Sequence, residues 1–244
     1  MKKGTSLGHG MKAYGALALL LQLASACSPS APQQQDARKG TNAAAASAMP
    51  KPSTAPAADQ KLIVAFGDSL FAGYGLAQGE GFAPALERAL VAQGLKARVF
   101  NAGVSGDTSG AARERLAFTL GGLPRKPDLM IVGLGGNDLL RGLDPGSTRA
   151  NLDAILRELK KRDIPVMLTG MVAAPNMGPD YAKAFNPIYP DLAKRYDAPL
   201  YPFILDGVIG HRALLLPDGM HPNPSGVGVM IGHVAPIVAA QLKG

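Results

Sequence analysis

Short apolar runs alternate with longer amphipathic stretches from about residue 61 to the end of the chain. The runs are rich in aliphatic and β-branched residues and are bounded by glycine or polar residues, which indicates buried strands. We predict five strands, of which the second ends at Asn101 and the fifth begins at Leu200: 62–66, 99–101, 129–134, 166–169 and 200–201. The stretches between and after them predict helices near 82–93, 109–120, 147–162, 180–196 and 224–242.

The order of these elements determines the fold class. Strands separated by helices of this length form a parallel sheet that is covered on both faces. We therefore expect an α/β fold with three layers, α/β/α, around a central five-stranded parallel sheet of flavodoxin-like order, 2-1-3-4-5. In that order a crevice opens at the carboxyl ends of strands 1 and 3, which is where reacting residues usually lie.

The first segment of the chain has a different pattern. Residues 1–26 place three lysines before the apolar run 16–23 and the small residues 24–26, which is the layout of a bacterial secretion signal. The run is too short to span a membrane as a permanent helix. Translation from Met11 would give the signal a more typical beginning, so Met1 and Met11 are both candidate starts.

A second segment separates this signal from the domain. Residues 27–60 consist mostly of Ala, Pro, Gln and Ser. Such a composition cannot bury a core, so we predict a disordered tether. Residues 61–244 then have the length of one ordinary domain.

The only cysteine, Cys27, directly follows the small residues. The stretch resembles the lipobox of bacterial lipoproteins, except that Ala24 stands where Leu or Val is usual. This resemblance implies lipidation at Cys27 and a membrane anchor. The alternative is ordinary cleavage after Ala26, which would release a soluble protein. Either way we expect a periplasmic or secreted protein without a disulfide framework.

Charge and histidine content argue against several classes of function. The formal net charge of +7, from 25 Lys and Arg against 18 Asp and Glu, is spread without a dense basic run or an aromatic platform, so we expect no nucleic-acid partner. The histidines have no metal-ligand spacing, so we expect neither a metal site nor a cofactor: His9, His211, His221 and His233. We expect a monomer.

The loops after the predicted strands carry the groups that acyl transfer requires. Ser69 follows the first strand and offers a hydroxyl, which needs a base to become a nucleophile. His221 can supply that base, and Asp218 in the same short loop can orient the imidazole. The oxyanion of a tetrahedral intermediate needs donors, for which we predict the amides of Ser69 and Gly103 and the side chain of Asn137.

Four ordered stretches then resemble one known family. They are similar to the four blocks of the GDSL or SGNH hydrolases, in particular to the bacterial periplasmic thioesterase, arylesterase and lysophospholipase branch: 67–70, 101–108, 135–138 and 218–221. The resemblance covers residues 61–244 and implies Ser69 as nucleophile with Asp218 and His221 completing the triad. The α/β-hydrolase nucleophile elbow, G-x-S-x-G, is absent because Phe71 stands where its second glycine would be.

Other polar residues in these loops have simpler interpretations. We interpret Asp68 and Asp138 as carboxylates that brace loops. Asp107 is expected to support the start of the helix that Thr108 or Ser109 caps. We interpret His211 and His233 as surface or packing residues.

Apolar residues near the same edge of the sheet favour a lipid-like substrate. The candidate residues of an acyl pocket are Leu70, Leu139, Met171 and Met177. We therefore predict a serine esterase acting on carboxylic esters and thioesters. Two alternatives remain open at this point, a glycan O-deacetylase that uses the same triad and an inactive, envelope-anchored binding module.

Overall fold

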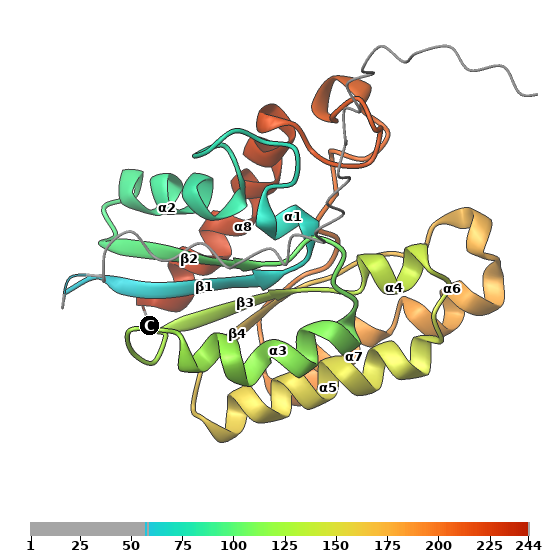
Figure 1. Cartoon of the computed structure of the whole chain (residues 1–244), viewed down its shortest axis with the longest axis horizontal. Coiled ribbons are helices and arrows are strands. Elements are labelled where there is room, and N and C mark those ends of the chain that lie inside the picture. Colours follow the sequence, from blue (N-terminus) through green and yellow to red (C-terminus); the bar gives the residue numbers. More distant parts are fainter. Residues whose placement is uncertain (1–56, 58, 244) are drawn as a thin grey trace, which may run out of the picture. The chain divides into compact units, whose positions relative to one another are not determined.

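The computed structural model describes residue 57 and residues 59–243, which form a five-stranded parallel sheet with helices on both faces (Figure 1). The strand order is β2-β1-β3-β4-β5, as predicted. The strands are β1 (Lys61–Gly67), β2 (Ala97–Gly103), β3 (Leu129–Gly133), β4 (Val166–Thr169) and β5 (Leu200–Tyr201). The predicted signal segment, Cys27 and nearly all of the predicted tether lie outside the described residues.

Helices connect the strands and follow the last one. The α-helices are α1 (Ser69–Ala72), α2 (Phe82–Ala92), α3 (Ser109–Gly121), α4 (Gly136–Leu140), α5 (Pro145–Lys161), α6 (Pro179–Phe185), α7 (Ile188–Tyr196) and α8 (Pro224–Lys243). Two short 3-10 helices are η1 (Pro175–Met177) and η2 (Arg212–Leu214).

The central strands divide their side chains between two cores. In β1, Ile63 and Ala65 pack into a first core on one side of the sheet, whereas Val64 and Phe66 pack into a second core on the other side. All four residues are fully buried. This is the alternation that a pleated strand imposes. Because both faces are covered, the strand reads in the sequence as one continuous apolar run.

The helices form the two outer layers. Helices α2 and α8 cover one face of the sheet, and α3, α5 and α7 cover the other (Figure 1). By length and composition α8 could cross a membrane, but it contributes buried residues such as Met230, Val234 and Val238 to the first core. Its apolar character is explained by that packing.

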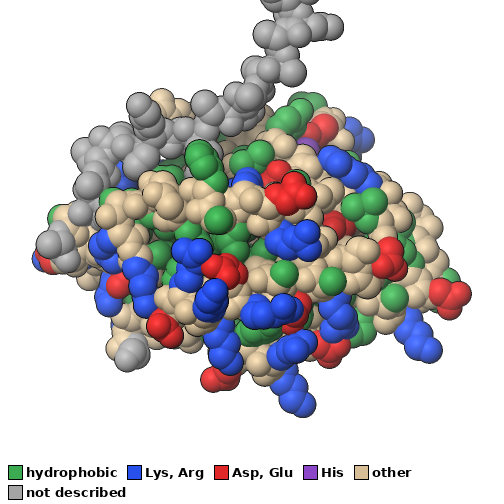
Figure 2. All heavy atoms as spheres, turned by 60° about the horizontal axis from the view of Figure 1, so that its bottom comes forward, with side chains coloured by type: hydrophobic (Ala, Val, Ile, Leu, Met, Phe, Trp, Pro, Cys, Tyr) green, Lys and Arg blue, Asp and Glu red, His purple; other side chains and the backbone are tan. Residues whose placement is uncertain are grey.

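The outward face of the layer formed by α3, α5 and α7 is charged. Figure 2 shows Lys and Arg side chains intermixed with acidic ones on this side of the molecule. Several form ion pairs, such as Arg162 with Glu158 at 2.6 Å and Arg149 with Asp191 at 2.9 Å. Exposed pairs of this kind contribute little to stability, so this face is an ordinary solvated surface.

Three glycines end neighbouring strands at the same level of the sheet. Gly67 is in register with Gly103 on one side and with Gly133 on the other. Helix α1 packs directly on these ends: a Cβ on Gly133 would lie 2.2 Å from the Phe71 ring, and one on Gly103 would lie 2.2 Å from the Ala72 nitrogen. The three glycines therefore let α1, which begins at Ser69, sit close to the sheet.

The structure corrects two predicted helices and decides between the two predicted caps of a third. The predicted helix 180–196 is two helices, α6 and α7, separated at Pro187, which has no N–H to continue the first one. Helix α5 begins at Pro145, and its cap is Asp144, whose carboxylate accepts a hydrogen bond from the Ser147 amide at 2.8 Å. At α3 the cap is Thr108, one of the two predicted candidates.

Candidate active site

Ser69 is the first residue of α1 and follows β1 after a single residue. Its Oγ lies 2.9 Å from His221 Nε2, and His221 Nδ1 lies 2.7 Å from Asp218 Oδ2. Hydroxyl, imidazole and carboxylate thus form one hydrogen-bonded chain. The geometry is that of an activated serine with an oriented base.

The Asp218 carboxylate is held by its own loop. Its Oδ1 accepts the main-chain N–H of His221 at 3.0 Å and that of Met220 at 2.9 Å. These amide bonds, together with the imidazole, lower the pKa of Asp218 to about 2. The carboxylate therefore stays ionised at neutral pH and faces the imidazole as an anion.

Two neighbours hold the His221 segment in place. The His221 carbonyl accepts the Leu216 amide at 2.7 Å, which closes the loop on itself. The ring of Tyr74 lies against the imidazole, with centroids 4.4 Å apart and planes tilted by 36°. The sequence places Tyr74 near the reactive edge, but the contact with His221 arises only because the fold brings the two loops together.

Two of the three predicted oxyanion donors belong to residues that line a cavity at the site. Ser69 begins α1, so its N–H has no acceptor within the helix. Asn137 lines the cavity in front of Ser69, and its Nδ2 donates one hydrogen to the carbonyl of Asp107 at 2.9 Å. An amide nitrogen has two hydrogens, so the second is free to act as a donor.

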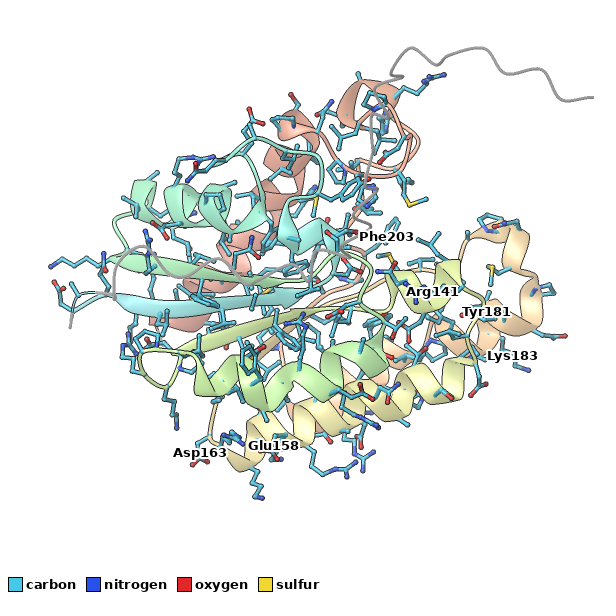
Figure 3. The ribbon with its side chains drawn as sticks, in the orientation of Figure 1. Arg141, Glu158, Asp163, Tyr181, Lys183 and Phe203 are labelled. Carbon is cyan, nitrogen blue, oxygen red and sulfur yellow. The ribbon has the colours of Figure 1, made fainter. Side chains whose placement is uncertain are left out.

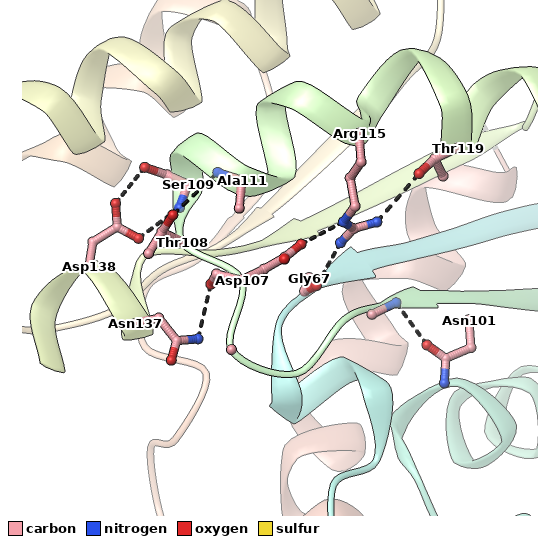
Figure 4. Close-up of polar contacts among 12 residues, drawn as sticks. Gly67, Asn101, Asp107, Thr108, Ser109, Ala111, Arg115, Thr119, Asn137 and Asp138 are labelled. Atoms are coloured by element: carbon pink, nitrogen blue, oxygen red, sulfur yellow. Dashed lines mark hydrogen bonds and ion pairs between the residues drawn. The ribbon is translucent and has the colours of Figure 1, made fainter. Parts of the chain in front are cut away.

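The structure contradicts the prediction for Gly103. Its N–H donates to the side-chain oxygen of Asn101 at 2.9 Å, and its Cα packs against α1 (Figure 4). Gly106, three residues later, lines the cavity with a φ of +85°. Among the described residues its N–H has no hydrogen-bond partner. The turn contains two glycines, and sequence alone did not show which one faces the serine.

The predicted bracing carboxylates are both buried. Asp138 accepts hydrogen bonds from the Ser109 amide at 2.7 Å, the Ser109 hydroxyl at 2.5 Å and the Thr148 hydroxyl at 3.1 Å. It therefore ties α4 to the beginnings of α3 and α5. Asp68 accepts the Leu70 amide at 3.1 Å, and burial raises its pKa to about 6.

A cavity of about 660 Å³ opens beside Ser69 and His221. Its walls are mostly apolar and include three of the four predicted pocket residues, Leu70, Leu139 and Met171. The fourth, Met177, is not among the lining residues and packs instead against the second core. Figure 3 shows Phe203, which also lines the cavity, and Arg141 toward the end of the sheet opposite Glu158 and Asp163.

The other histidines of the domain and two aromatic residues of α6 and α7 lie outside this arrangement. His233 stacks on Tyr201, with ring centroids 5.4 Å apart, and His211 is exposed. Phe185 and Tyr189 are fully buried core residues. Within residues 59–243, no group of His, Cys, Asp and Glu side chains is arranged to hold a metal ion.

The order of these parts along the chain identifies the family. Residues 65–228 match the GDSL-like Lipase/Acylhydrolase family. The chain belongs to this family. The match begins inside β1 and ends in the first turn of α8, so it includes every loop that contributes to the site.

The chain is also similar to relatives that are named as ester hydrolases. Esterase TesA of Pseudomonas aeruginosa is 38% identical over 169 residues, which cover 69% of this chain and 83% of the relative. Thioesterase 1/protease 1/lysophospholipase L1 of Escherichia coli is also 38% identical over 169 residues, with 69% and 78% covered. The crystal structure of AlinE4, an SGNH-hydrolase family esterase, is 49% identical, with a TM-score of 0.65 and coverage of 76% and 98%. The predicted family, α/β fold and ester-hydrolase class are thereby confirmed.

Proposed function

We propose that this GDSL-family enzyme hydrolyses carboxylic esters and thioesters of lipid-like substrates through an acyl-enzyme on Ser69. The observation that carries the proposal is the chain of contacts from Ser69 Oγ through the His221 imidazole to Asp218, at 2.9 and 2.7 Å. A serine hydroxyl hydrogen-bonded to an oriented imidazole is activated for attack on an acyl carbon.

In the first half of the reaction the enzyme is acylated. The oxygen of Ser69 forms a bond to the acyl carbon while His221 Nε2 takes the hydroxyl proton, and the carbonyl electron pair moves to the oxygen. The amides of Ser69 and Gly106 and the side chain of Asn137 are placed to stabilise this oxyanion. The intermediate collapses when the carbon–oxygen or carbon–sulfur bond breaks, and the imidazolium returns its proton to the leaving alcohol or thiol.

In the second half water replaces the leaving group. His221 takes a proton from the water, whose oxygen attacks the acyl carbon, and the released Ser69 receives that proton back. Asp218, which is ionised because its pKa is about 2, stabilises the imidazolium in both halves.

The cavity supports a substrate with an acyl chain. Most of the exposed large apolar side chains among the described residues line the cavity: Tyr74, Leu140, Val172, Ile209 and Met220. Contiguous exposed apolar surface of this kind marks binding sites. An apolar groove next to the nucleophile favours the lipid-like ester over a compact, polar substrate.

Labelling with a fluorophosphonate probe tests the proposal directly. We expect the wild-type protein to be labelled and to hydrolyse p-nitrophenyl butyrate, and the folded Ser69→Ala variant to do neither. Thr108→Ser, a change at a helix cap that retains the hydroxyl, serves as the matched control and should be labelled normally. Labelling of Ser69→Ala at the wild-type rate would contradict the assignment.

We also propose that the enzyme is exported by residues 1–26 and held at the membrane of the periplasm through a lipid on Cys27, with residues 27–60 as a tether. The position of the only cysteine behind Ala24-Ser25-Ala26 supports this. Mature lipoproteins carry several acyl chains, and more than one chain is needed for stable anchoring. Wild type should therefore sediment with membranes and Cys27→Ser should not; wild type in the soluble fraction would favour ordinary secretion.

A further inference from the structure

Arg115 on α3 contacts two of the loops that form the active site. Its Nη2 donates to the carbonyl of Gly67 at 3.0 Å, and its Nε donates to the carboxylate of Asp107 at 2.5 Å (Figure 4). Its guanidinium also lies over the ring of Phe66, 4.3 Å from the centroid. One planar group thus joins the end of β1 to the turn after β2.

Asp107 extends this connection to the third loop. Its side chain faces Arg115, while its main-chain carbonyl accepts the hydrogen bond from Asn137 Nδ2 at 2.9 Å. It directly follows Gly106 in the turn. Every proposed oxyanion donor therefore lies on, or within two residues of, a group that Arg115 or Asp107 contacts.

We propose that Arg115 is a positioning residue that sets the relative placement of the three oxyanion donors, an inference that rests on the proposed function. The donors come from three separate loops, on Ser69, Gly106 and Asn137. A preorganised site requires such groups to be fixed before the reaction, since reorganisation during it would cost free energy. Arg115 connects these loops and is not among the residues that line the cavity.

The chemistry of the contacts favours positioning over two other roles. The Arg115 and Asp107 side chains are only 16% and 11% exposed, and a buried ion pair of this kind is weak as a source of net stability. The adjacent carboxylate also neutralises the guanidinium, so the pair offers little net charge to an oxyanion. What Arg115 provides is the rigid fork that donates in two directions at once, which a lysine cannot reproduce.

The inference is tested by a double-mutant cycle between Arg115→Met and Asn137→Ala, measured on a soluble p-nitrophenyl ester, with the rate of Ser69→Ala subtracted as a blank. We expect Arg115→Met to lower kcat about 10- to 100-fold while KM changes less than about threefold, because misplaced donors weaken mainly the transition state. Arg115→Lys, which keeps the charge, should recover only part of this loss. Arg113→Met, an exposed arginine on the same helix, is the matched control and should leave kcat unchanged.

The double variant distinguishes positioning from general destabilisation. If Arg115 acts through the oxyanion site, Arg115→Met should cost less in a protein that already lacks the Asn137 donor than in wild type, so the two losses should not multiply. Losses that multiply, or a folded Arg115→Met with wild-type kcat, would overturn the inference. So would failure of both Arg115 variants to fold, since it would assign the residue to domain stability. If wild type shows no activity above Ser69→Ala, the proposed function itself fails.

Discussion

The imidazole Nε2 of His221 lies 2.9 Å from the hydroxyl oxygen of Ser69, although 152 residues separate the two in the chain. The contact exists because α1 begins at the carboxyl end of β1 and the loop before α8 returns to the same edge of the sheet. The strand order therefore brings the two side chains together, and in the proposed mechanism neither can act without the other.

This dependence gives the first prediction. His221→Ala should lower kcat about as far as Ser69→Ala, and the double variant should lose little more, because members of a triad act as a unit. Steady-state kinetics on one ester, with circular dichroism to confirm folding, would measure this. Folded His221→Ala with more than about a tenth of wild-type kcat would mean that another group serves as the base.

The second prediction separates the two glycines of the turn after β2. Gly103→Ala should cause a large loss of thermal stability, because the new Cβ would lie 2.2 Å from the main-chain nitrogen of Ala72. In Gly106→Ala the Cβ meets only Arg141, at 3.8 Å, but the φ of +85° strains the turn that carries the proposed donor. We expect a modest fall in Tm, with kcat reduced about tenfold or more.

A different result for Gly103→Ala would reverse this assignment. Should Gly103→Ala fold with normal Tm and show reduced kcat, the original assignment of Gly103 to the oxyanion site would be restored. Thermal unfolding and initial rates measured on the same preparations are sufficient to decide.

A third prediction concerns neighbours with different roles. Asn137→Ala should lower kcat about 10²- to 10³-fold with a small change in KM, since its donor matters most when the oxyanion forms. Asp138→Asn should lower Tm more and kcat less, because it replaces one of the two acceptor oxygens that bind Ser109 and Thr148. A larger kcat defect in Asp138→Asn would show that the carboxylate takes part in the chemistry.

The fourth prediction is a pH dependence of stability. Burial raises the pKa of Asp68 to about 6 from an ordinary 3.8, so the folded protein binds this proton more tightly than the unfolded chain between about pH 4 and pH 6. The contribution of Asp68 to the free energy of unfolding should therefore fall as pH rises through this window, by on the order of 3 kcal/mol. Asp68→Asn does not ionise at this position, so its free energy of unfolding lacks this pH dependence.

Denaturant unfolding of both proteins at several pH values would measure the difference. Relative to wild type, Asp68→Asn should gain stability as the pH rises from 4 to 7. Parallel pH profiles for the two proteins would show that the Asp68 carboxyl ionises normally despite its burial.

The sequence predicted the sheet well because both faces of it are buried. Continuous apolar runs such as Leu129–Gly133 have no other stable location in a domain of this size, and the strand order follows from the alternation with helices. The contacts of Ser69, His221 and Asp218 were predictable for a related reason: each residue lies in a loop, or directly after one, at the carboxyl edge of the sheet.

Features that depend on local backbone geometry were not predictable in this way. Gly103 and Gly106 have similar sequence surroundings, and only the packing of α1 against the first leaves the second to face Ser69. Met171 and Met177 lie in one loop, but η1 turns the second away from the cavity. The contact between the Tyr74 and His221 rings joins two loops that are distant in the sequence, and neither loop has a sequence pattern that would predict it.

The last prediction concerns the substrate and uses the two methionines. Each buried methylene contributes about 0.8 kcal/mol, or up to about fourfold in kcat/KM, until the groove ends. On p-nitrophenyl esters kcat/KM should therefore rise from acetate to a medium-chain acyl group. Met171→Ala should reduce this rise for the longer esters and leave acetate nearly unchanged, whereas Met177→Ala, outside the cavity, should keep the wild-type profile. Hydrolysis restricted to acetate, without turnover of longer chains, would instead favour a glycan deacetylase, whose site needs room only for a methyl group beside the nucleophile.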